Sequence, residues 1–137
     1  MILAPASDDY SVIVGYFILF FHFVAFVLVV LLEGVVLYKL KWNAFKRSLL
    51  DSFLVNLVTT IIGLILASVF SFPFWDRFSY TLGMILSVAL LWGLSMLIEG
   101  GLLFVIGRKS LAKAYRAAFF INISSYILLC ILYLVLF

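Results

Sequence analysis

Residues 10–32 read YSVIVGYFILFFHFVAFVLVVLL, a run of about 23 residues that contains no Asp, Glu, Lys or Arg. A helix of about 20 apolar residues crosses the roughly 30 Å hydrocarbon core of a bilayer. This stretch therefore predicts a transmembrane helix. Three similar runs of about 19–21 residues follow it, at Leu50–Phe70, Tyr80–Ile98 and Ala117–Phe137.

The composition of the whole chain points to the same class. Of 137 residues, 68% are hydrophobic and 11% are charged, and the mean hydropathy is +1.36. A soluble domain needs more polar surface than this to cover its core. Backbone groups in lipid must be satisfied within the segment, which favours helices over open sheets. We therefore predict an all-α integral membrane protein, with a single four-helix transmembrane domain over residues 1–137.

The sequence predicts no signal peptide, no disulfide and no nucleic acid partner. The first residues are acidic, with Asp8 and Asp9, and lack the basic segment of a secretory signal. Cys130 is the only cysteine, so neither an internal disulfide nor a cysteine metal cluster is predicted. The formal charge of +3 follows from membrane topology, and no nucleic acid partner is predicted.

The basic residues predict an orientation. Short loops rich in Lys and Arg stay on the cytoplasmic side, so both connectors are expected there, with both termini and the aromatic loop 71–79 outside. This pattern predicts a bacterial inner membrane, with membrane lipid as a partner. Headgroup contact is a second role for the same cations. Eight of the nine lie in the two connectors: Lys39, Lys41, Lys46, Arg47, Arg108, Lys109, Lys113 and Arg116.

The chain also contains an internal repeat at a shift of 66 residues. Glu33 recurs as Glu99 (99 − 33 = 66), each acid is followed by a glycine, and Asn56 recurs as Asn122. Apolar matches are common in membrane sequences, whereas polar and glycine matches in one register are not. The pattern predicts two tandem helical hairpins, about 10–71 and 80–137, related by an axis along the membrane normal.

Each repeated acid has a predicted partner within its hairpin. Glu33 and Asn56 are equidistant from position 44.5, and Glu99 and Asn122 from position 110.5, so each pair lies at one depth. One hypothesis is a buried hydrogen bond that holds the two helices together, worth about 0.6–2 kcal/mol in a membrane. A second structural hypothesis places the acids at the cytoplasmic membrane–water interface. The other reading is a proton or cation site, because acids within a membrane often mark pathways.

A lone histidine and a set of small residues are also candidates for a role. His22 lies near the middle of the first run and is more often a packing residue than a ligand, because no second His is present. Small residues at four-residue spacing predict close helix packing. The helix-packing residues are Thr59, Gly63, Ala67, Gly83, Ser87 and Gly93.

No motif for phosphate binding, zinc hydrolysis or nucleophilic catalysis occurs in the chain, so an enzyme is not expected, and no cofactor or metal site is predicted. We predict a non-enzymatic accessory or scaffold subunit that packs against other integral membrane proteins, with a homo-oligomer also compatible. The alternative is a small proton- or cation-coupled transporter or channel that uses Glu33 and Glu99. A third hypothesis is a subunit that supplies His22 to a cofactor held by a partner.

Overall fold

A computed structural model describes residues 7–69 and 80–136, with side-chain surroundings for most of residues 11–66 and 82–135. It contains four helices in its described part: α1 (Ser7–Lys39), α2 (Phe45–Val69), α3 (Tyr80–Gly107) and α4 (Leu111–Leu136). All four are long and apolar enough to cross a membrane. The prediction of an all-helical chain with four segments long and apolar enough to span a membrane is therefore confirmed. The aromatic loop 71–79 and Ser71 lie outside the described residues.

The helices are longer than the apolar runs that predicted them. The run Tyr10–Leu32 lies inside α1, which continues to Lys39, and the run Ala117–Phe137 begins six residues after the start of α4 at Leu111. The difference arises because hydropathy marks only the segment that lipid can cover. The backbone hydrogen bonds of a helix continue past that segment into its polar ends.

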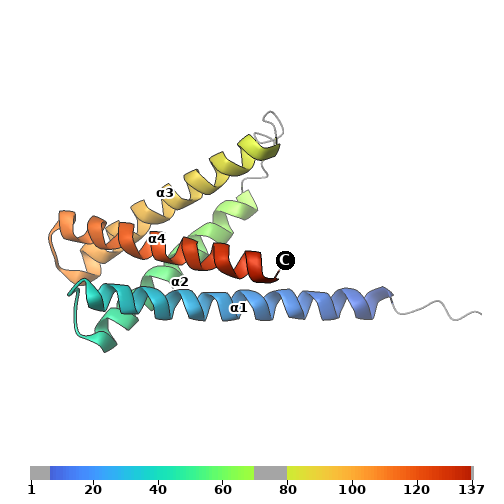
Figure 1. Cartoon of the computed structure of the whole chain (residues 1–137), viewed down its shortest axis with the longest axis horizontal. Coiled ribbons are helices and arrows are strands. Elements are labelled where there is room, and N and C mark those ends of the chain that lie inside the picture. The colour runs from blue at the N-terminus through green and yellow to red at the C-terminus, as the bar shows by residue number, and fades with distance from the viewer. Residues whose placement is uncertain (1–6, 70–79, 137) are drawn as a thin grey trace, which may run out of the picture.

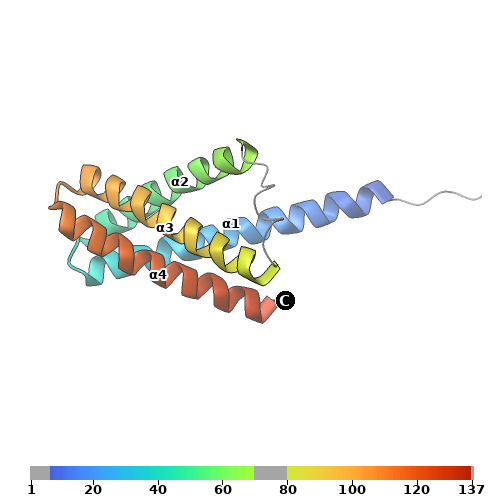
Figure 2. The ribbon, with the colours of Figure 1, turned by 90° about the horizontal axis from the view of Figure 1, so that it is seen from above.

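The four helices form a ring in which each packs against two neighbours. α1 packs on α2, α2 on α3, α3 on α4 and α4 on α1, whereas no Cα atoms of the diagonal pairs approach within 8 Å among the described residues. The helices converge at the end that carries the two described connectors and separate toward the other end (Figures 1 and 2). The N-terminal part of α1 extends beyond the other three helices in both views.

The apolar core lies at the connector end of the ring. Small side chains of α4 allow the close approach there, since Ala114, Ala117 and Ala118 are buried. The remaining members of this core are Leu37, Trp42, Val55, Leu103 and Ile121. Further along the ring, buried polar side chains such as Glu33, Glu99 and Asn122 join the apolar ones.

The connector after α1 is fixed by a Schellman motif. The Trp42 amide donates to the Leu37 carbonyl at 3.0 Å and the Lys41 amide donates to the Tyr38 carbonyl at 2.9 Å. This motif needs a residue in the left-handed conformation, usually glycine, at the first position after the helix cap, which is also the donor of the second bond. Lys41 takes that conformation with a φ of 55°. The contact between Trp42 and Leu37 in the core holds it there.

Candidate functional site: a polar cavity between the four helices

A cavity of about 260 Å³ lies in the middle of the ring. Each helix contributes polar side chains to its lining, including both repeated acids, Glu33 and Glu99. Apolar contacts are few, and come from Val29 and Leu129. The other lining residues are polar: Asn56, Thr59, Thr60, Ser95, Asn122, Ser125 and Tyr126. We call this space, with these eleven lining residues, the central cavity.

Glu33 is held from three directions. Its side chain is 1% exposed. Asn56 Nδ2 of α2 donates to Glu33 Oε2, and Ser52 Oγ lies 3.5 Å from the same oxygen. Ser125 Oγ of α4 donates to Glu33 Oε1 at 2.6 Å. The carboxylate thus joins α1, α2 and α4 through both of its oxygens.

Glu99 has a smaller set of partners. It is 3% exposed, and Asn122 Nδ2 of α4 donates to its Oε2 at 2.6 Å. Among the described residues, no donor contacts Glu99 Oε1. An acceptor of a buried carboxylate that lacks a protein donor can be satisfied by water, a proton or a cation. Glu99 is therefore the acid of the central cavity with spare binding capacity.

Positions 66 residues apart do not have equivalent contacts in this structure. A shift of 66 residues relates Ser125, the cross-ring donor to Glu33, to Thr59 on α2 (125 − 66 = 59). Thr59 lines the cavity, but its hydroxyl donates to the Val55 carbonyl of its own helix at 2.9 Å. A second difference lies at Ser52, whose counterpart is Ala118 (52 + 66 = 118) and carries no hydroxyl. Glu33 is consequently held more tightly than Glu99.

The glycine after each acid is a point of close helix contact. A Cβ atom at Gly34 would lie 2.8 Å from Leu49 Cδ1 and 3.0 Å from Leu49 Cα of α2. At Gly100 it would lie 2.7 Å from two ring atoms of Tyr115 on α4. The missing side chains let the two helices of each pair approach at these points, which places each acid against its asparagine.

The predicted helix-packing residues fall into different surroundings. A Cβ atom at Gly63 or Gly93 would meet nothing within 4 Å among the described residues, so close contacts lie instead at Gly34, Gly100 and Gly107. Gly83 is buried and accepts from the Ser87 hydroxyl at 2.7 Å. The side-chain surroundings of Ala67 lie outside the described residues.

His22 lies away from the central cavity. It is exposed and does not line the cavity, and its Nδ1 lies 2.7 Å from the Ile18 carbonyl. If Nδ1 carries the proton, Nε2 is left as a free acceptor. In the described part of the chain, no group of three or more His, Cys, Asp or Glu side chains is arranged to hold a metal ion.

One buried acid was not singled out from the sequence. Asp51 is completely buried near the start of α2. Its Oδ2 accepts from Trp42 Nε1 and from Asn43 Nδ2, both at 3.1 Å, and its Oδ1 lies 2.9 Å from Arg47 Nε. These contacts attach the connector to α2. An acid eight or nine residues after Asn43 and Trp42 has no recognisable spacing, so only the tertiary structure identifies this network.

No known protein family, curated protein or solved structure matches the chain significantly. The function proposed below is therefore inferred from the side chains of the site and not from similarity to a known protein.

Proposed function

We propose that the central cavity is a proton- or cation-binding site, and that the protein is a small membrane transporter or channel coupled to that ion. The observation that carries the proposal is the position of Glu33 and Glu99, two buried acids from different helices that line one polar cavity. Two ionised carboxylates facing one cavity repel each other, and a proton or a cation bound between them relieves the repulsion. Intramembrane acids commonly serve this role.

The surrounding side chains suit the same chemistry. Carboxylate, amide and hydroxyl oxygens are the ligands that hard cations prefer. Asn122, Ser125 and Thr59 offer such oxygens at the level of the acids. The ion binds at Glu99, because both carboxylate oxygens of Glu33 already accept hydrogen bonds. No enzymatic reaction is part of this function.

The proposed function makes a first prediction about flux. The double variant Glu33→Gln/Glu99→Gln keeps the side-chain volume and the asparagine contacts but removes both charges. We expect ion flux to fall at least about tenfold, because the site can no longer exchange a proton or balance a cation. The measurement uses proteoliposomes loaded with a pH-sensitive dye, with imposed gradients of H⁺, Na⁺ or K⁺.

His22→Gln is the matched control, since it changes a titratable residue outside the central cavity. Flux through this variant should equal that of the wild type. If vesicles with the wild-type protein transport none of the three ions faster than empty liposomes, the proposed function is wrong. Equal flux through the double variant would remove the two acids from the mechanism.

For the arrangement in the membrane, we propose two tandem hairpins of the same orientation, with both connectors at the cytoplasmic face of a bacterial inner membrane. The eight cations in the connectors and in the adjoining helix ends support this orientation. The matched contacts Glu33–Asn56 and Glu99–Asn122 support the repeat. A thiol-reactive probe that cannot cross the membrane would test the orientation: Lys109→Cys in a Cys130→Ala background should be labelled only from the cytoplasmic side.

A second candidate function is a subunit that packs against other membrane proteins, and the exposed half of α1 supports it. Residues 11–20 are exposed around the whole helix, and Phe17 is 69% exposed. This segment extends beyond the ring, where none of the other described helices covers it (Figure 2). His22 would face the same partner, and a cofactor bound there would show a changed visible spectrum on His22→Ala.

A photo-crosslinking residue tests this second function. Placed at position 17, it should crosslink to another protein in native membranes. The same residue at position 64 is the control, because Leu64 is 67% exposed but lies on the ring itself. Lipid adducts alone at both positions would contradict a partner on α1.

A further inference from the structure

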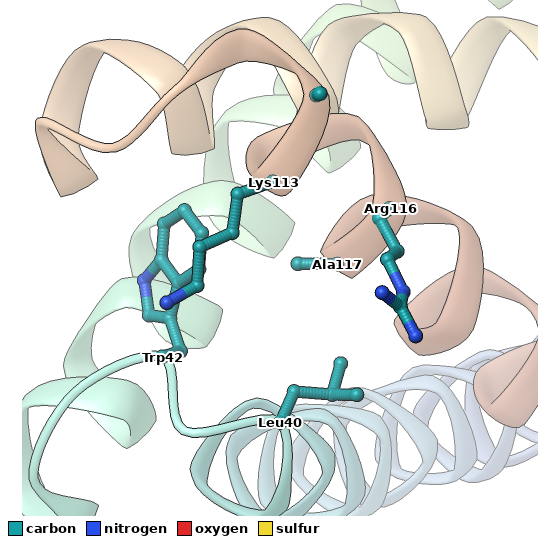
Figure 3. A pocket seen from close by; sticks show the side chains of 6 residues that line it. Leu40, Trp42, Lys113, Arg116 and Ala117 are labelled. Atoms are coloured by element: carbon teal, nitrogen blue, oxygen red, sulfur yellow. The ribbon is translucent and has the colours of Figure 1, made fainter.

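A second cavity lies at the connector end of the molecule, apart from the central cavity. It measures about 400 Å³ and lies between the connector after α1 and the first turns of α4 (Figure 3). Its lining combines apolar and cationic side chains: Leu40, Trp42, Ala112, Lys113, Arg116 and Ala117. We call this space the connector pocket.

The two cations of the connector pocket lie on one side of α4. Lys113 and Arg116 are three residues apart, which places them on neighbouring turns of the same helix face. Figure 3 shows both side chains at the edge of the pocket, with Ala117 and Leu40 between them. None of its described lining residues is acidic.

Neither cation is neutralised within the described part of the chain. Lys113 Nζ has only a long contact, 3.4 Å, with the Lys41 carbonyl. Arg116 has no hydrogen bond or ion pair with any described residue. The acid of this end, Asp51, is completely buried and already bonded to Trp42, Asn43 and Arg47.

The fold fixes the wall of the connector pocket that faces the two exposed cations, Lys113 and Arg116. Trp42, one wall, is 1% exposed and is fixed by the Schellman motif and by its bond to Asp51. Ala112 and Ala117 leave space because their side chains end at Cβ. The pocket is thus open before any ligand arrives, which lowers the entropic cost of binding.

An anion with an apolar part fits this combination of groups. Arg and Lys bind phosphate through charge-assisted hydrogen bonds. Leu40 is half-buried and Ala112 is exposed, and these two offer an apolar surface beside the cations. The pocket lies at the ends of the membrane-spanning segments, the level of lipid headgroups, where basic pockets between helices bind anionic lipids. We propose that the connector pocket binds a phosphate group through Lys113 and Arg116, and its apolar lining favours the phosphate of an anionic phospholipid over free phosphate.

Native mass spectrometry of the detergent-solubilised full chain tests the proposal. The probes are dioleoylphosphatidylglycerol, dioleoylphosphatidylcholine and inorganic phosphate. We expect Lys113→Gln/Arg116→Gln to bind phosphatidylglycerol about 25-fold more weakly than the wild type, since each cation near an anionic headgroup contributes about a factor of five. The matched control is Lys39→Gln/Lys109→Gln, which removes the same charge from the same end outside the pocket, and should retain wild-type binding.

A second variant tests the pocket without removing charge. Ala112 is exposed at the pocket edge, so Ala112→Phe should fold and should block the pocket, with a similar loss of phosphatidylglycerol binding. Inorganic phosphate that binds the wild type but neither pocket variant would support the phosphate site and assign it to a soluble ligand. An equal loss of phosphatidylglycerol affinity in the pocket double variant and in the control double variant would overturn the proposal. Phosphatidylcholine that binds the wild type as tightly as phosphatidylglycerol would overturn it as well. An unchanged affinity in both pocket variants would overturn it too.

Discussion

Asp51→Ala is expected to lower the free energy of unfolding by about 3 kcal/mol. The substitution removes the acceptor of two donors, Trp42 Nε1 and Asn43 Nδ2, of which the first is buried. A buried donor left without a partner costs about 1–3 kcal/mol, and bonds to a charged acceptor lie toward the upper part of that range. The loss also releases the connector from α2. Denaturation in mixed detergent micelles, followed by helical circular dichroism, measures the change.

Two further variants separate the contributions to this effect. Arg47→Ala should cost less than about 1 kcal/mol, because the arginine side chain is 50% exposed and its ion pair is screened by solvent. Asp51→Asn keeps an oxygen for Trp42 and should fall between the other two. A loss in Arg47→Ala as large as in Asp51→Ala would show that the ion pair, and not the bond to Trp42, stabilises the connector.

Gly107→Ala is expected to destabilise the protein by about 2 kcal/mol, although alanine is the better helix former. A Cβ atom at Gly107 would overlap Trp42 Cζ2 and lie 3.0 Å from both Cε2 and Cη2. The indole is rigid and buried, so either it or the end of α3 must move. Overpacking of this kind costs about 1–3 kcal/mol, which exceeds the gain of up to about 1 kcal/mol from replacing glycine in a helix.

Gly101→Ala is the matched control on the same helix. Nothing lies within 4 Å of an added Cβ at that position among the described residues. Its free energy of unfolding should stay unchanged or rise slightly, through helix propensity alone. Tryptophan fluorescence during detergent denaturation would report both variants. A Gly107→Ala protein as stable as Gly101→Ala would show that the contact between α3 and the connector does not contribute to stability.

Residue spacing in the sequence predicts some contacts of the central cavity but not others. The positions of Glu33 and Asn56 about the connector place them at one depth, and the structure brings their side chains into a hydrogen bond. Spacing could not find the contact between Ser125 and Glu33, which are 92 residues apart in the chain. That contact requires α4 to lie beside α1 in the ring, and helix order around a bundle leaves no periodic mark in an apolar sequence.

The connector shows a related limit. Lys41 adopts a left-handed conformation usually taken by glycine. No glycine marks the turn in the sequence. The core contact of Trp42 with Leu37, together with the bond to Asp51, compensates for the backbone cost. Local preference was therefore overridden by packing between parts of the chain that are separate in sequence.

By itself, the sequence determined the helical class, the four spans and the positions of the polar residues along them. It did so because the bilayer imposes a length and a hydropathy on each span, and both can be read residue by residue. The tertiary structure decided which polar groups meet. It placed two acids in one cavity, with fewer donors to Glu99 than to Glu33. Among the described residues, it left Lys113 and Arg116 without an acidic partner. Those outcomes depend on helix neighbours and rotations, which are set by packing and not by composition.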